Sequence, residues 1–248
     1  MRRSFFVFVG LVVVSLLFFA FENPENSTVT VKQQVNNRAD SASISPDAGH
    51  NIYDQLLLAD KGLTLSTFEN AWEGYCKLAS GNELKKQILS IADMSQPSCQ
   101  KRLYIIDVAA KKLLINTLVA HGRNSGEAKA THFSNTPESL QSSLGFYVTG
   151  NTYDGNNGYS MRLRGMEKGF NDQAENRAIV MHGAPYVNEE IARKTGRIGR
   201  SWGCPAVSVK EHKLIIDLIK GGSCLFVFAP EKQYLAHSAF THDDSASL

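Results

Sequence analysis

The sequence predicts a mainly β domain with a few short helices, preceded by a small helical subdomain. Short runs rich in Ile, Leu and Val, separated by loops rich in Gly, Asn and Ser, dominate the chain after residue 86. Before them, between residues 49 and 81, apolar residues recur at helical spacing. The 248 residues are 43% hydrophobic and 20% charged, a composition typical of a globular chain with a sizeable core.

The N-terminus predicts export. Arg2 and Arg3 form a basic start, and the stretch from Phe5 to Phe21 carries no charge. Residues 1–21 are therefore expected to be either a cleaved signal peptide or a membrane anchor that contacts the membrane. Cleavage after Ala20 would place the bulky Phe18 where a small residue is preferred. We expect a periplasmic or cell-envelope location, with the inner membrane as the site of any anchor.

Residues 22–48 are polar and predict a flexible tether. The helical subdomain is expected over 49–97. Its first helix follows the pattern of Ile52 and Leu56 and ends at Gly62, and its second begins at a capping box of Ser66 and Glu69.

The next domain is expected over 98–232, before a polar tail at 233–248. The predicted strands, the first of which still lies within 49–97, are Gln87–Ala92, Leu103–Val108, Leu113–Ala120, Gly145–Thr149, Ala178–Met181 and Leu225–Phe228. Helices are expected at Asn188–Lys194 and after a second capping box of Ser208 and Glu211.

One cysteine stands in a setting that suggests chemistry. Cys204 lies between Gly203 and Pro205, and the pair His182-Gly183 precedes it by 22 residues (204 − 182). A thiol attacks carbonyl carbon as its thiolate, and a nearby imidazole is the usual means of generating one. A glycine lets backbone N–H groups approach a substrate, and a proline stiffens the turn. The pattern indicates a nucleophile with its base, although isolated cysteines and histidines are more often structural.

The SWGCPAV stretch, with the preceding HGA, resembles the catalytic core of the L,D-transpeptidase (YkuD-type) family, in its murein L,D-transpeptidase catalytic domain branch. The similarity runs from about Leu63 to Ala229 and includes KRLYIIDV, FSNTP and GGSCLFVF. It implies a β-sandwich or barrel that remodels peptidoglycan. The commoner members have a His at the position of Trp202 and an Arg shortly after the cysteine, where this chain has Pro205-Ala206.

The resemblance implies a cysteine acyltransferase that needs no cofactor. Cys204 would attack the L-centre carbonyl of diaminopimelate in a tetrapeptide stem, and D-Ala would leave. His182 would activate the thiol, with the Gly183 carbonyl orienting the ring. Backbone N–H groups of Trp202, Gly203 and Cys204 would form the oxyanion hole.

Four further side chains are expected to contact the substrate, a peptidoglycan stem peptide: Ser201, Arg200, Tyr147 and Arg162. Arg200 or Arg197 is expected to replace the missing Arg. Two alternatives stay open. In the first, water is the acceptor and the protein is an L,D-carboxypeptidase. In the second, the chain is a catalytically silent module that binds the cell wall.

Other classes are disfavoured. The 26 basic residues nearly balance 24 acidic ones, which gives no reason to expect nucleic-acid binding. His121, His132 and His182 lack the H-E-x-x-H spacing of a zinc peptidase, so no metal is expected. Cys224 is expected in the core, and Cys76 with Cys99 is the one disulfide pairing considered.

Three short matches to penicillin-binding proteins are treated as accidental, because their residues fall on the wrong elements. They are Ser98–Lys101, Tyr186–Asn188 and Lys194–Gly196.

Overall fold

The computed structural model describes residues 46–241. The expected signal or anchor segment at 1–21, nearly all of the expected tether, and the last residues of the polar tail lie outside the described residues.

A single eight-stranded sheet is the framework of the described residues, with the strand order β3-β2-β1-β8-β4-β5-β6-β7. Its strands are β1 (Ile88–Asp93), β2 (Leu103–Asp107), β3 (Lys112–Thr117), β4 (Gly145–Gly155), β5 (Gly158–Gly165), β6 (Val180–Ala184), β7 (Ala206–Ser208) and β8 (Cys224–Phe228). The pairs β1–β8 and β6–β7 are parallel, and the other neighbours are antiparallel. The predicted mainly β class is confirmed.

The two ends of the sheet approach each other. The chain that leaves β3 forms an isolated antiparallel bridge between Ala120 and Ala206 of β7, in which the Ala120 N–H donates to the Ala206 carbonyl at 2.8 Å. The sheet is therefore nearly closed, like a barrel. β7 is only three residues long, and it is held by β6 on one side and by this bridge on the other.

The central strands are buried along their whole length, which explains their continuous apolar sequence. Every residue of β8 is buried, as are five of the six residues of β1. Phe146 of β4 stacks on Phe226 of β8 with the ring centroids 4.1 Å apart. One core continues from these strands into the helices.

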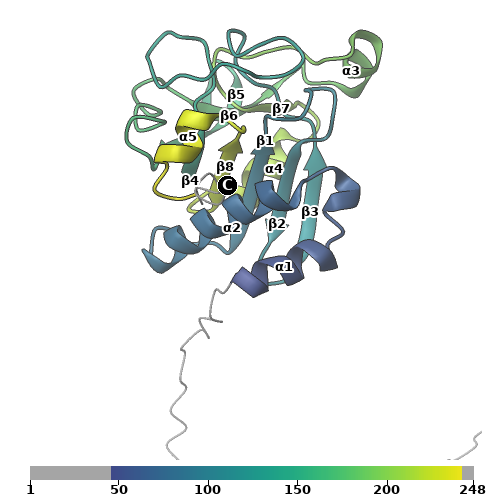
Figure 1. Cartoon of the computed structure of the whole chain (residues 1–248). Helices are drawn as coiled ribbons and strands as arrows, with labels where there is room; N and C mark the ends of the chain where they lie inside the picture. The colour runs from purple at the N-terminus through teal and green to yellow at the C-terminus, as the bar shows by residue number, and fades with distance from the viewer. Residues whose placement is uncertain (1–45, 242–248) are drawn as a thin grey trace, which may run out of the picture. The chain divides into compact units, whose positions relative to one another are not determined.

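The helices flank the sheet (Figure 1). They are α1 (Pro46–Gln55), α2 (Leu65–Ser80), α3 (Glu189–Thr195), α4 (His212–Ile219) and α5 (Lys232–His237), with the 3-10 helix η1 at Ala59–Lys61. Helix α2 crosses in front of the strands in Figure 1 and contacts β1 and β8, while α4 lies behind them against β5 and β6. No helix within residues 46–241 is long and apolar enough to cross a membrane.

The expected division into a helical subdomain at 49–97 and a second domain at 98–232 stays a prediction, and the described residues make many contacts across that boundary. β1 falls within 49–97 but pairs with β2 and β8. Phe68 and Trp72 of α2 belong to the same hydrophobic core as Phe226. The helices thus cover the sheet as one unit with it, because the amphipathic α2 buries its apolar face there.

Two helix ends differ from the expectation. Helix α2 begins slightly earlier than expected, because Thr64 rather than Ser66 is its N-cap. The Thr64 hydroxyl accepts a hydrogen bond from the Thr67 N–H at 3.3 Å. Residues 233–237 of the expected polar tail belong to α5 (Lys232–His237) instead. The Glu231 carboxylate caps this helix, and Tyr234 is fully buried, so an apolar anchor holds the segment in place.

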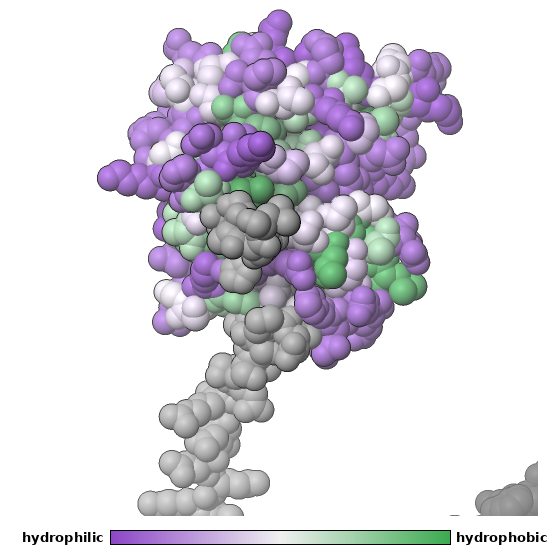
Figure 2. All heavy atoms as spheres, in the orientation of Figure 1, coloured by the Kyte–Doolittle hydropathy of each residue, from purple (hydrophilic) through white to green (hydrophobic). Residues whose placement is uncertain are grey.

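Figure 2 shows the face that carries α1 and α2, where hydrophilic residues predominate and hydrophobic ones lie between them. Leu57 and Leu65 are among the large apolar side chains that remain exposed.

Candidate functional site

Neighbouring strands bring His182 and Cys204 close together. His182 lies in β6 and pairs with Ala206 of β7, and Cys204 precedes Ala206 by two residues. Cys204 itself lies in the turn before β7, and its sulfur is 3.5 Å from the nitrogen of Val180, two residues before His182 on β6. The thiol and the imidazole are therefore attached to neighbouring segments of the structure.

The His182 ring is oriented by a backbone carbonyl. Its Nδ1 lies 3.0 Å from the Gly183 oxygen. A carbonyl only accepts hydrogen bonds, so Nδ1 carries the proton and Nε2 keeps its lone pair. Burial lowers the pKa of His182, the Gly183 bond opposes this, and nearby His212 lowers the pKa further. The ring is therefore neutral at neutral pH, the state that a general base requires.

The thiol of Cys204 is half-buried and faces the start of β6. Its Sγ lies 3.5 Å from the Val180 nitrogen, which donates to it, and 3.8 Å from the Ala178 oxygen. Ala178 has φ 52°, in the left-handed region that alanine rarely adopts. No hydrogen bond joins the thiol to His182 among residues 46–241. In this structure the thiol is therefore not directed at the His182 ring.

Burial raises the pKa of the Cys204 thiol, while the Val180 N–H and the positive charge of Arg177 lower it. The site thus contains both a factor that favours the neutral thiol and two that favour the thiolate.

Ser201 shapes the turn that carries the thiol. Its hydroxyl donates to the Cys204 carbonyl at 2.6 Å and accepts from the Gly203 N–H at 3.1 Å. The side chain is only 3% exposed. The hydroxyl therefore holds the turn in this structure, and substrate contact by Ser201 stays a prediction.

The same bond alters the expected oxyanion hole. The Gly203 N–H already has a partner and is not a free donor in this structure, so its part in the oxyanion hole stays a prediction. The N–H groups of Trp202 and Cys204 make no hydrogen bond to any described residue and stay candidates. Gly203 has φ 123°, and a Cβ there would lie 2.8 Å from the Gln141 oxygen, so the turn requires glycine.

Tyr147 does not face a cleft. The side chain is 1% exposed, and its hydroxyl donates to the Ser143 carbonyl at 3.0 Å. β4 is buried on both faces at this position, and substrate contact by Tyr147 stays a prediction that this burial does not support. Arg162, by contrast, is exposed, pairs with Val180 across β5 and β6, and lies 4.8 Å from the centroid of the Tyr153 ring. Its role stays a prediction.

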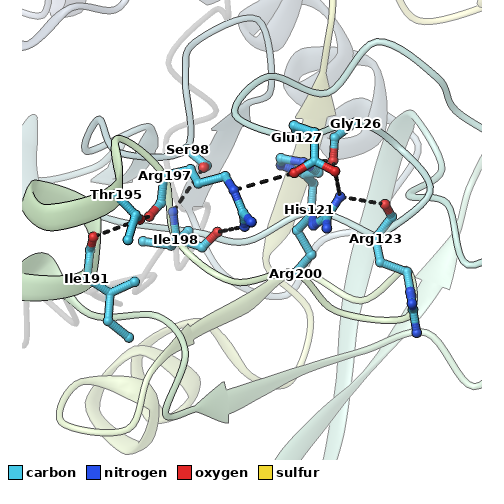
Figure 3. A network of polar contacts seen from close by, with 10 residues as sticks. All are labelled: Ser98, His121, Arg123, Gly126, Glu127, Ile191, Thr195, Arg197, Ile198 and Arg200. Carbon is cyan, nitrogen blue, oxygen red and sulfur yellow. Dashed lines mark hydrogen bonds and ion pairs between the residues drawn. The ribbon is translucent and has the colours of Figure 1, made fainter.

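The two expected substitutes for the missing Arg are both engaged by one carboxylate. Figure 3 shows Arg197 and Arg200 directed at Glu127, at 3.4 Å and 2.7 Å. Arg200 also donates to the carbonyls of Arg123 and Gly126. Arg200 therefore fastens the loop around Glu127, and substrate binding by it would require these bonds to open.

Two residues of the site have no signal in the sequence. Arg177 follows a loop, and its guanidinium reaches the vicinity of the thiol. His212, the first residue of α4, packs on Gly183, where an added Cβ would lie 2.7 Å from the imidazole Cγ. Neither position belongs to a recognisable motif, because both are brought to the site by tertiary packing.

The remaining cysteines are free thiols. Cys76 packs against the main core and Cys99 against a second cluster, so the pairing considered for them is wrong. Cys224 is fully buried, as expected. Within the described residues, no three His, Cys, Asp or Glu side chains are grouped to hold a metal ion.

Comparison with protein families places this geometry in context. Residues 59–228 match the family model YkuD_2, the L,D-transpeptidase catalytic domain. The chain belongs to this L,D-transpeptidase family. The match covers most of the chain and contains both His182 and Cys204, and it confirms the resemblance found in the sequence. A comparison with curated proteins gives no significant match.

Solved structures of L,D-transpeptidases are among the similar folds. The L,D-transpeptidase from Mycobacterium smegmatis is 14% identical, with 58% of this chain and 59% of that chain covered and a TM-score of 0.35. The L,D-transpeptidase (Yku) from Stackebrandtia nassauensis is 13% identical, with coverages of 74% and 77% and a TM-score of 0.33. The helical cell shape determining protein Pgp2 from Campylobacter jejuni is 13% identical, with coverages of 61% and 54% and a TM-score of 0.37.

This chain thus spans about three fifths of the length of the mycobacterial enzyme and about half that of Pgp2. At such identities and scores these structures add no argument to the family assignment, which stands on the family model alone.

Proposed function

We propose that this protein is a peptidoglycan-remodelling cysteine acyltransferase, an L,D-transpeptidase that acts on tetrapeptide stems. The observation that carries the proposal is the His182 ring, whose Nδ1 is bound by the Gly183 carbonyl on the strand next to Cys204. This bond leaves Nε2 as the base, in a chain whose family is that of L,D-transpeptidase catalytic domains.

In the first half-reaction, Nε2 of His182 accepts the proton of the Cys204 thiol. The sulfur attacks the L-centre carbonyl of diaminopimelate and forms a thioester as the bond to D-Ala breaks. The imidazolium returns its proton to the leaving amine. The free N–H groups of Trp202 and Cys204 are the candidate donors to the oxyanion, and one such donor is typically worth about 10²–10³ in rate.

In the second half-reaction, the diaminopimelate side-chain amine of another stem attacks the thioester. The new amide forms, and the sulfur leaves and regains its proton through His182. Water as the acceptor would release a tripeptide instead, and the protein would then be an L,D-carboxypeptidase.

One observation favours a second candidate, a silent module that binds the cell wall. The thiol is directed at Val180 and Ala178 rather than at His182, and burial raises its pKa. A thiol that never turned toward the ring would leave the fold intact and the chemistry absent.

The deciding experiment incubates the purified protein with disaccharide-tetrapeptide muropeptides and follows products by mass. A cross-linked dimer is the expected product, and Cys204→Ala and His182→Ala should each abolish it. The matched control is Cys99→Ala, which removes another partly exposed thiol and should retain activity. Tripeptide alone would indicate hydrolysis, and activity retained in Cys204→Ala would refute the assignment.

A carbapenem separates the silent module from the enzyme. A reactive Cys204 should gain the mass of the drug in the wild type and in Cys99→Ala, but not in Cys204→Ala. The absence of both adduct and product would favour the silent module.

We also propose that the protein works in the cell envelope. The support is the basic start and uncharged stretch of residues 1–21, together with a peptidoglycan substrate, which lies outside the inner membrane. Fractionation of cells that produce the full chain tests this, since a cytoplasmic pool alone would contradict it.

A further inference from the structure

The Cys204 thiol lies in surroundings that do not by themselves favour its reactive form. The contact with the Val180 N–H stabilises a thiolate, whereas the Ala178 oxygen is an acceptor and suits a protonated thiol. Because burial penalises the charged form, a thiolate at this position requires a compensating positive charge nearby. His182 does not supply it at rest, because burial keeps that ring neutral.

Arg177 lies where such a charge is needed. It directly precedes Ala178, whose carbonyl faces Sγ. The Nη2 atom of Arg177 also lies close to Gly203, the neighbour of Cys204: a Cβ added to Gly203 would be 3.4 Å from it. The guanidinium is thus next to the turn that carries the sulfur and next to the segment that the sulfur contacts.

The guanidinium is held in place by neutral acceptors. Nη1 donates to the Ser134 carbonyl at 2.6 Å and to the Ser143 hydroxyl, and Nη2 donates to the Gln141 carbonyl at 2.7 Å and the Ser139 hydroxyl at 3.2 Å. These bonds fix its position before any substrate arrives.

The charge of Arg177 is not neutralised by a partner. Among residues 46–241, no carboxylate lies within ion-pair distance of it, whereas Arg164, Arg197 and Arg200 all pair with glutamates. An arginine that is half-buried, fixed and without a counter-ion acts on nearby charges more strongly than an exposed, paired one.

The other ionisable groups around the thiol do not replace it. Burial raises the pKa of Tyr186 to about 12, so this phenol stays neutral beside Cys204. His212 lies against Gly183, and Arg162 is exposed and lies over the ring of Tyr153.

We propose that Arg177 is a positioning residue whose fixed positive charge stabilises the Cys204 thiolate. The proposal rests on the proposed function only in taking Cys204 as the nucleophile. It assigns to an arginine far upstream in the sequence the electrostatic support for the sulfur.

The test measures the thiol rather than turnover. The rate of alkylation of Cys204 by iodoacetamide is followed against pH by peptide mass, which separates Cys204 from the other three cysteines. Replacing Arg177 by Gln should raise the apparent pKa of Cys204 by about one unit, the lower end of the range for a nearby opposite charge. At pH 7 the alkylation rate should fall about tenfold.

The conservative variant distinguishes charge from structure. Arg177→Lys keeps the charge but loses the planar fork, so the midpoint should stay within about half a unit of the wild type. The matched control Arg164→Gln removes an exposed arginine that pairs with Glu83 and should leave the profile unchanged. If Arg177→Gln does not fold, Arg177→Lys alone decides, because a midpoint one unit higher in that variant would overturn the proposal.

A different role for Arg177 gives a different result. If the guanidinium binds a substrate carboxylate instead, Arg177→Gln raises KM for muropeptides while the alkylation profile stays at the wild-type midpoint, and the proposal is wrong. Alkylation is also independent of the reaction. A shifted midpoint in a protein without transpeptidase activity would support Arg177 and refute the proposed function separately.

Discussion

Replacing Ser201 by Ala tests whether one hydroxyl fixes the turn that carries Cys204, the proposed nucleophile. The hydroxyl is buried, donates to the Cys204 carbonyl and accepts from the Gly203 N–H. Each net hydrogen bond is worth about 0.5–1.5 kcal/mol, and the two backbone groups lose a partner in a place with little water. We expect the variant to be about 2 kcal/mol less stable to unfolding. For a domain of this size, that corresponds to a fall in Tm of about 4–8 °C.

Urea and thermal denaturation measure this loss, with Ser80→Ala as the control. The Ser80 hydroxyl also donates to a carbonyl, that of Lys77, but it is exposed, so its removal should change stability by less than about 0.5 kcal/mol. The alkylation rate of Cys204 should also change in Ser201→Ala and not in Ser80→Ala. A Ser201→Ala protein as stable as the wild type, with an unchanged thiol, would refute the idea that this hydroxyl fixes the turn.

Three further predictions concern buried groups. His121 is fully buried with its pKa lowered to about 4, so the unfolded chain takes up its proton first as the pH falls below 6.5. Stability should therefore drop by about 3 kcal/mol between pH 6.5 and 4, at about 1.4 kcal/mol per unit, and His121→Gln should flatten this dependence in urea titrations. The acid limb of kcat/KM should have its midpoint below pH 6.5, because burial lowers the pKa of His182 and the neutral ring is the active form; a midpoint above 6.5 would contradict the assignment of the base. Tyr234→Phe removes the 2.9 Å hydrogen bond to the buried Glu167 carboxylate and should cost about 1–2 kcal/mol in denaturant unfolding, whereas unchanged stability would show that α5 does not need it.

The elements with strong local patterns were predictable. The apolar run at the end of the chain gave β8, because a strand buried on both faces has no polar alternation. The Ile and Leu spacing before Gly221 gave α4. Local pattern failed where it was weak: β5 contains Arg162 and Arg164 and was not recognised, and β7 has only three residues.

The candidate site divides in the same way. His182 and Cys204 stand next to glycines in short motifs, so the sequence alone could nominate them as candidates. The exposure of a side chain could not be predicted in the same way. Gly145–Thr149 is buried on both faces, and no local signal distinguishes Tyr147 from a residue that reaches the surface. Arg177 is the opposite case, because its importance depends on acceptors contributed by residues 134–143, and that juxtaposition is created only by folding.

The short strand β7 follows directly on the turn that carries the proposed nucleophile, Cys204. Its three residues have one full neighbour, β6, and beyond them a single bridge to Ala120 closes the seam of the sheet. Because so few hydrogen bonds close the sheet at this seam, local opening should require the least free energy there. Amide hydrogen exchange should therefore be faster at the seam than in β8. Small openings of this seam would move Cys204 relative to His182 without disturbing the core. Such motion would allow the thiol, which in this structure contacts Val180 and Ala178, to reach the imidazole.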